Sequence, residues 1–149
     1  MKDYTPNGWE KIKQQDYVKY GISENPNLVI ISAYTFENNF IELIECDDDE
    51  NFMRNVVVEY YGLISDKGMQ ENIGIEPKWL FQHKIGEIEI TLTLVQSLVG
   101  DKIYSASIFF NKNGKNLGLN ILSSSFPLKE FDFITSNIYK GIEELILNI

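Results

Sequence analysis

The stretch Gly86–Val99, GEIEITLTLVQSLV, alternates strictly between apolar and polar residues, and this alternation decides the fold class. The side chains at every second position from Ile88 to Leu94 are apolar, and the intervening ones are Glu or Thr. A period of two with one polar side is typical of a half-buried strand in an antiparallel sheet. The stretch therefore predicts an antiparallel sheet with one covered face.

Further alternating runs and turn sequences on both sides extend this strand into a meander. Residues 100–101 (GD) and 111–114 (NKNG) have turn chemistry, and Lys102–Asn111 and residues 117–122 alternate beside them. Trp79–Lys84 alternates just upstream. We expect these runs to form three or four consecutive antiparallel strands.

The N-terminal third predicts a separate hairpin. Val18, Tyr20 and Ile22 alternate on a first strand, and residues 23–27 contain the turn sequence NPN. Residues 28–35 form an apolar run that is typical of a buried second strand.

Two helices are also predicted. Pro127 precedes an apolar stripe spaced by three and four residues, which predicts one long C-terminal helix. The stripe consists of Phe131, Ile134, Ile138, Ile142, Leu145 and Ile149. A middle helix over Asp48–Tyr61 is predicted from apolar residues spaced by four. A strand through Val56–Val58 is the alternative, because β-branched runs disfavour a helix.

These elements predict one α+β domain over residues 1–149: an antiparallel sheet of about six strands, with a middle helix and a long C-terminal helix packed on it. This order resembles the small PsbP-like α/β/α sandwich family. The resemblance includes NGWEK at residues 7–11 and the closing SSSFPLKEFDFITSNIYKGIEEL at residues 123–145. It implies a protein that binds other macromolecules rather than an enzyme, such as a bacterial adaptor or chaperone-like protein.

The formal charge of −9 is concentrated in the first half of the chain. Residues 1–75 contain 14 acidic and 6 basic residues, whereas residues 76–149 contain 8 and 7. Such a surface repels phosphate backbones and anionic membranes and attracts basic proteins. The composition therefore disfavours nucleic-acid and membrane binding and favours a basic protein partner.

The remaining composition is that of an ordinary folded cytoplasmic protein. The N-terminus lacks the apolar run of a signal peptide, and no apolar stretch approaches the roughly 18 residues of a membrane span. One cysteine cannot form an internal disulfide. The oligomeric state, monomer or homodimer, stays open.

Residues 45–50, ECDDDE, place five carboxylates and the only cysteine in six consecutive positions. An EF-hand loop counted from Asp48 fails, because Phe52 and Met53 take positions that need an oxygen ligand and glycine. An irregular Ca²⁺ or Mg²⁺ site, a helix cap, a solvated loop and a surface for a basic partner all stay open. Carboxylates around Cys46 oppose a reactive thiolate, which disfavours catalysis with His83.

No catalytic, metal or cofactor motif is present in the sequence, so we expect no enzyme activity and no cofactor. The leading hypothesis is a cytoplasmic bacterial immunity or inhibitor protein that neutralises a basic toxin by occlusion. Its predicted partner-binding residues are Glu42, Glu45, Asp47, Asp48, Asp49 and Glu50. The alternative is a PsbP-like adaptor that binds an apolar segment. A hydrolase with Glu87 and Glu89 as paired carboxylates is a third hypothesis.

Overall fold

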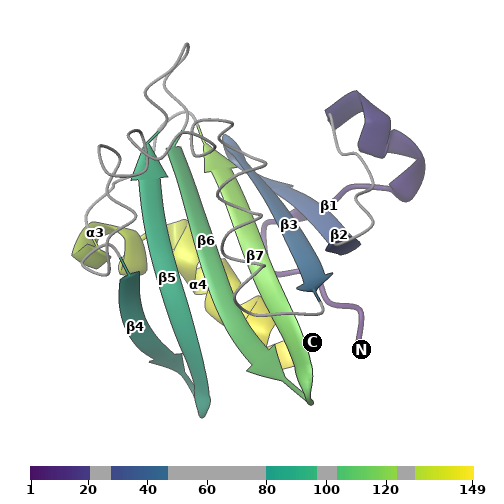
Figure 1. The fold of residues 1–149 in the computed structure, drawn as a ribbon. Coiled ribbons are helices and arrows are strands. Elements are labelled where there is room, and N and C mark those ends of the chain that lie inside the picture. Colours follow the sequence, from purple (N-terminus) through teal and green to yellow (C-terminus); the bar gives the residue numbers. More distant parts are fainter. Residues whose placement is uncertain (21–27, 47–79, 97–103, 124–129) are drawn as a thin grey trace, which may run out of the picture.

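A computed structural model of the chain describes residues 1–20, 28–46, 80–96, 104–123 and 130–149. Within these ranges, seven strands form one antiparallel sheet in the order β1-β2-β3-β7-β6-β5-β4 (Figure 1). The strands are β1 (Glu10–Lys11), β2 (Leu28–Phe36), β3 (Asn39–Cys46), β4 (Leu80–Ile85), β5 (Ile88–Gln96), β6 (Tyr104–Lys112) and β7 (Lys115–Ser123). The helical elements of the described residues are the 3-10 helix η1 (Gln14–Tyr20), α3 (Glu130–Ile134) and α4 (Asn137–Asn148).

The predicted meander is confirmed as β4 to β7. The alternating stretch forms β5, and its neighbours β4 and β6 pair with it in antiparallel register. β6 and β7 are joined at Asn113-Gly114, where both residues have positive φ angles of 55° and 76°. Asn and Gly tolerate this left-handed conformation, which matches the twist of a hairpin. The predicted turn at residues 100–101 lies outside the described residues.

The predicted N-terminal hairpin is wrong in its first strand, whereas its second strand, predicted over residues 28–35, is confirmed as β2. Val18 and Tyr20 belong to η1 rather than to a strand, and Ile22 lies outside the described residues. β2 pairs instead with β3, which follows it after a two-residue turn at Glu37-Asn38. Residues 39–46 were therefore missed as a strand, although Asn38-Asn39 is turn chemistry and apolar residues follow at alternate positions.

The predicted long C-terminal helix is also wrong, because the chain breaks between α3 and α4. Ser136 has extended angles of φ −77° and ψ 162° before α4 begins. The hydroxyl of Thr135 donates to the Phe131 carbonyl at 2.8 Å, and that of Ser136 donates to the Phe133 carbonyl at 2.5 Å. Such local side-chain bonds compete with a continuing helix.

The predicted fold class, about six strands with a middle helix and a long C-terminal helix, is therefore corrected. The described part of the chain is mostly a seven-stranded antiparallel sheet with a short pair of C-terminal helices. The middle helix predicted over Asp48–Tyr61 lies outside the described residues.

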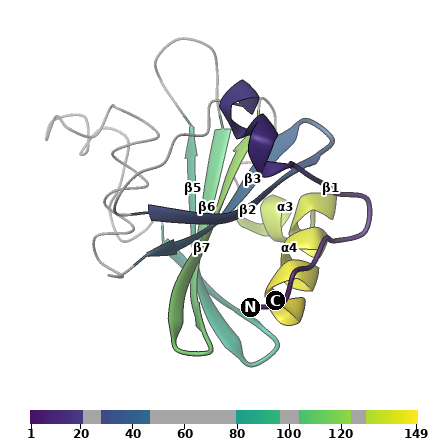
Figure 2. The same cartoon turned by 90° about the vertical axis from the view of Figure 1, so that its right-hand side faces the viewer.

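The apolar core lies between one face of the sheet and α4 (Figure 2). Residues of six strands, β2 to β7, enter it, including Leu92, Ile108 and Leu119, each 0% exposed. Trp9 of the NGWEK segment is 6% exposed and packs on α4. A Cβ at Gly141 would lie 2.4 Å from Trp9 Nε1, so the helix approaches the indole at the one residue without a side chain.

Candidate functional site

The predicted acidic docking segment begins at the end of β3. Glu45 is half-buried and lies opposite Val29 of β2, whose side chain is 60% exposed. The β2–β3 hairpin is strongly twisted, and this end of it projects on the side of the sheet away from α4 (Figure 2). Asp47, Asp48, Asp49 and Glu50 lie outside the described residues.

Glu42 and Glu45 do not share a surface. They are three residues apart on one strand, so their side chains leave opposite faces of the sheet. Glu42 lies on the face opposite α4, is 3% exposed, and makes an interaction of its own within the chain. The predicted set of partner-binding residues is therefore split, because Glu42 is not on the exposed surface.

Glu42 belongs instead to a buried polar row that crosses four strands on the face opposite α4. Strand register pairs Glu42 with Asn120, Asn120 with Ser107, and Ser107 with Thr93. The exposed fractions of the four side chains are 3%, 1%, 6% and 3%. Period two places each of these residues on the same face of the sheet, but the row itself depends on strand order, which no local sequence pattern reports.

The hydrogen bonding of this row is incomplete among the described residues. Ser107 Oγ donates to Asn120 Oδ1 at a long 3.4 Å. Asn120 Nδ2 and Thr93 Oγ1 have no hydrogen-bond partner within the described part of the chain. A buried polar atom without a hydrogen-bond partner lowers the free energy of unfolding by about 1–3 kcal/mol. This face therefore stabilises the fold less than an apolar face with the same burial would.

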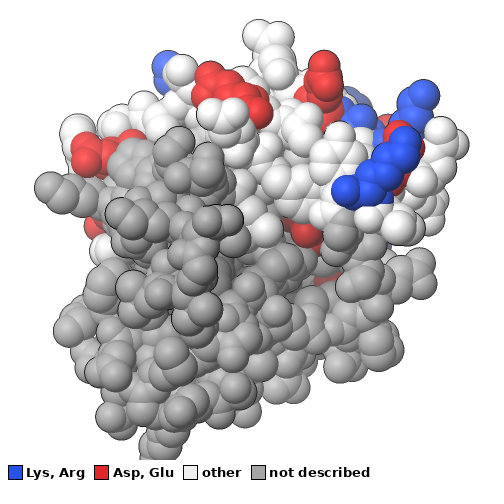
Figure 3. Space-filling view, turned by 90° about the horizontal axis from the view of Figure 1, so that it is seen from above, with Lys and Arg blue, Asp and Glu red and all other residues white. Residues whose placement is uncertain are grey.

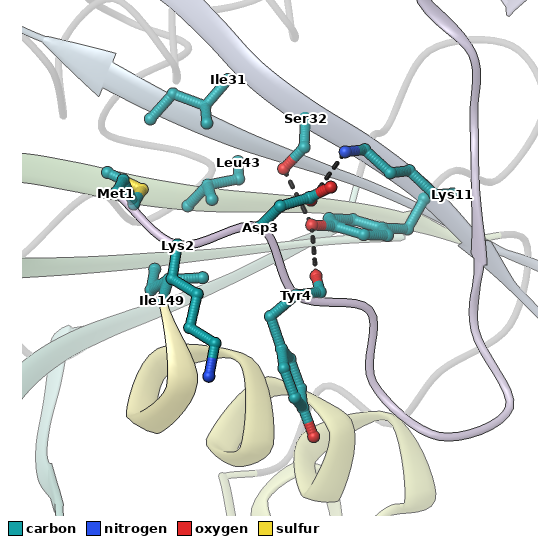
Figure 4. Close-up of a pocket in the computed structure, with 10 residues that line it drawn as sticks. Met1, Lys2, Asp3, Tyr4, Lys11, Ile31, Ser32, Leu43 and Ile149 are labelled. Atoms are coloured by element: carbon teal, nitrogen blue, oxygen red, sulfur yellow. Dashed lines mark hydrogen bonds and ion pairs between the residues drawn. The ribbon is translucent and has the colours of Figure 1, made fainter.

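A cavity of about 310 Å³ lies on the α4 side, where the two ends of the chain meet (Figure 4). The N-terminal segment, β2, β3 and Ile149 at the end of α4 line it (Figure 4). The lining residues are Met1, Lys2, Asp3, Tyr4, Lys11, Ile31, Ser32, Tyr34, Leu43 and Ile149. No local sequence pattern marks this site, because residues far apart in the chain form it.

A hydrogen-bond network fixes the polar side of this cavity. The Tyr34 hydroxyl donates to the Tyr4 carbonyl at 2.8 Å and accepts from Ser32 Oγ at 2.9 Å. Lys11 Nζ lies 2.7 Å from Asp3 Oδ1. Burial raises the pKa of Tyr34, and the hydrogen bond to Asp3 raises the pKa of Lys11. The Tyr4 hydroxyl donates to Glu144 on α4, which ties the N-terminal segment to the helix.

The charged surface beside η1 is mixed rather than uniformly acidic. Figure 3, seen from above, shows lysines and carboxylates interspersed on this side. Lys19 Nζ lies 3.3 Å from Asp16 Oδ1 within η1. The charged residues of η1 therefore do not add to the acidic surface that the sequence predicts for residues 45–50.

The residues considered for catalysis are not brought together. Cys46 ends β3 and His83 lies on β4, and three strands separate β3 from β4 in the sheet. At ~4.8 Å per strand, this places their backbones roughly 19 Å apart. His83 Nε2 instead lies 2.6 Å from Glu130 Oε1, without the angle of a hydrogen bond. Glu87 and Glu89 are both exposed.

Comparison with known proteins gives no match to a family model, to a curated protein or to a solved structure. The resemblance to the PsbP-like family stays a prediction. The described residues contain no group of three or more His, Cys, Asp or Glu that could hold a metal ion. Within the same ranges, no helix has both the length and the apolar character needed to cross a bilayer.

Proposed function

We propose that this protein is a non-catalytic binding module that occludes a basic partner protein, and that residues 45–50 are its docking surface. The observation that carries this proposal is the pairing of Glu45 with Val29 at the projecting end of the β2–β3 hairpin. An exposed apolar side chain beside a carboxylate, with four more acids following in sequence, is suited to a partner with both apolar and basic groups.

Charge supports a basic partner. Residues 28–46 contain three glutamates and no lysine or arginine, within a chain of formal charge −9. The most concrete partner is a bacterial toxin such as a nuclease, whose lysines and arginines hold substrate phosphates. An immunity protein would pair with those groups and exclude the substrate. Association would then be fast and would weaken as salt rises.

Glu42 has no direct role in this proposal. Its side chain is 3% exposed on the face opposite α4, where it cannot pair with a partner's lysine at the surface. The docking surface proposed here is therefore narrower than the sequence prediction and consists of Glu45, Asp47, Asp48, Asp49 and Glu50.

The test is capture of partners from a lysate of the source organism at low and high salt. The docking variant carries Asp47→Asn, Asp48→Asn, Asp49→Asn and Glu50→Gln. The control variant has the same net charge and carries Glu87→Gln, Glu89→Gln, Asp132→Asn and Glu143→Gln. We expect the native protein and the control variant to capture a basic protein at low salt, and the docking variant to lose it. Equal capture by all three would contradict the proposal.

A second candidate function is an adaptor that binds an apolar segment of a partner, as the PsbP-like resemblance implies. The exposed side chains of η1 favour it: Val18 is 85% exposed and Tyr20 is 51% exposed. This function predicts capture that is insensitive to salt and is lost on Val18→Asp with Tyr20→Asp. The docking variant would leave such capture unchanged, which separates the two candidates.

A further inference from the structure

One edge of the sheet is only partly covered by its outermost strand. β1 pairs with β2 at Tyr34 and Thr35, and the Ile12 amide donates to the Ala33 carbonyl at 2.8 Å. No described strand pairs with residues 28–32 on that side of β2. Alternate residues of a strand direct their N–H and C=O groups to each side, so an unpaired stretch presents groups that a further strand can bind.

The sequence of β2 lacks the charges that protect many edge strands. Lysines and other charged residues on an edge discourage pairing with another chain. β2 reads LVIISAYTF and has no charged residue over its nine positions. β4, at the opposite edge of the sheet, has six residues and contains His83 and Lys84. Val29 is 60% exposed, so the start of β2 is open as well as uncharged.

The charge beside this edge favours one kind of occupant. Val29 pairs with Glu45 across β2 and β3, so both side chains lie on the same face of the sheet. An added strand would lie roughly 10 Å from β3, a distance that a lysine and a glutamate side chain span together. Residues 28–46 contain three glutamates and no lysine or arginine. A second copy of this chain would bring the same negative charge, whereas a basic segment would be attracted.

We propose that residues 28–32 of β2 accept an extended segment of the basic partner as an additional edge strand, with lysines or arginines of that segment beside Glu45. This inference rests on the proposed function, because it describes how the same partner docks. Backbone hydrogen bonds to the edge supply affinity, and the charge pairing selects the partner. The register shift between Ile30 and Ser32 limits the added strand to a few residues.

The test measures binding of synthetic peptides to the full chain by calorimetric titration at low salt. The probe is acetyl-KVKVKV-amide, an extended basic sequence with valine at alternate positions. Acetyl-EVEVEV-amide reverses its charge, and an analogue N-methylated at every residue keeps the charge but loses the backbone N–H donors. We expect saturable binding of the probe and about tenfold weaker binding of each analogue. Absence of probe binding, or equal binding of the N-methylated analogue, would overturn the proposal.

Two variants and amide hydrogen exchange locate the peptide. Val29→Lys should weaken probe binding about tenfold, because it places a like charge beside the added strand. Phe131→Lys, which makes the same charge change at a 72% exposed residue of α3, should leave probe binding unchanged. Amide exchange at residues 28–32 should slow when the probe binds, whereas exchange in β4 should stay the same. Unchanged exchange at residues 28–32 would refute strand addition.

The proposed function can stand while this mode of docking fails. If the docking variant loses a basic protein that the native chain captures, but the peptide tests fail, residues 45–50 bind the partner without an added strand. Amide exchange at residues 28–32 that slows with the concentration of the protein alone would place a second copy on this edge. That result would contradict the assignment of the edge to a basic partner.

Discussion

Both faces of the central sheet contain buried residues, but the two faces differ in their chemistry. On β7, Leu119 and Asn120 are adjacent and are 0% and 1% exposed, yet one enters the apolar core under α4 and the other joins the buried polar row. The α4 face gains from apolar burial, whereas the polar row contains two atoms without partners among the described residues. Burial therefore does not identify the stabilising face. Stability comes mainly from the α4 side, which holds the apolar core.

We expect the largest loss of stability when a polar residue of the kind found on the opposite face replaces an apolar residue on the α4 face. Leu92→Thr replaces a 0% exposed core residue with the residue type found at the next position of β5. It removes buried apolar volume and buries a hydroxyl, so we expect a loss of about 3 kcal/mol in the free energy of unfolding. Guanidinium denaturation measures this loss. A loss below about 1 kcal/mol would mean that the two faces do not differ as described.

Gly141→Ala tests the contact between Trp9 and α4. Alanine favours a helix over glycine by about 1 kcal/mol, but its Cβ would lie 2.4–2.6 Å from three indole atoms. We expect the clash to exceed the helix preference, with a net loss of about 1–2 kcal/mol. Combining it with Trp9→Phe removes the clashing indole atoms, so the double variant should be more stable than the sum of the single losses predicts. If the loss of stability in the double variant equals the sum of the two single losses, the contact between Trp9 and Gly141 would be contradicted.

A smaller effect is expected where the β6–β7 hairpin meets the end of α4. Lys112 Nζ donates to the Ile146 carbonyl at 2.6 Å, in the last turn of the helix, where a cation is favourable. Lys112→Met should lower the free energy of unfolding by about 1 kcal/mol. Lys115→Met is the matched control, because Lys115 is its exposed cross-strand neighbour. Equal effects of the two substitutions would show that the contact between Lys112 and the Ile146 carbonyl does not stabilise the fold.

The smallest effect concerns the pH dependence of stability, and we expect it only in alkaline solution. Burial among core residues raises the pKa of Tyr139 to about 12 from an ordinary value of 10.0. The folded state then keeps its phenol proton while the unfolded state loses it, so stability is full below pH 10 and falls as pH rises toward 12. Tyr139→Phe should reduce this alkaline fall in melting temperature and leave the pH 7 value nearly unchanged. An identical alkaline profile would contradict the buried phenol.

The predictions from sequence succeeded where a local pattern was sufficient. The strict alternation from residue 86 onward identified β5, the neighbouring runs identified β4 and β6, and the Asn-Gly turn identified the β6–β7 hairpin, because period and turn chemistry are local. The N-terminal hairpin failed because apolar spacing in residues 18–22 was read as a strand, whereas Val18 and Tyr20 lie in η1. The break after α3 depends on two hydroxyl-to-carbonyl bonds that apolar periodicity does not report.

The candidate sites were less accessible to sequence reasoning, because they depend on contacts between distant segments. Grouping Glu42 with Glu45 treated nearness in sequence as nearness in space, but an odd spacing on a strand sends side chains to opposite faces. The polar row depends on β7 inserting between β3 and β6. The cavity depends on Met1 and Ile149 lying at the same place, as both ribbon views show (Figures 1 and 2).

The most direct test of the contrast between the two faces is the free energy of unfolding of Thr93→Val against the native protein. Valine keeps the shape of threonine and removes only the buried hydroxyl that has no partner in the described part of the chain. Thr91→Val, which removes a hydroxyl bonded to Gln82 Oε1 at 3.2 Å, is the control on the same face of β5. We expect Thr93→Val to raise the free energy of unfolding by about 1 kcal/mol and the control to lower it slightly. A decrease of more than about 1 kcal/mol for Thr93→Val would show that the polar row contributes to stability and would contradict the account.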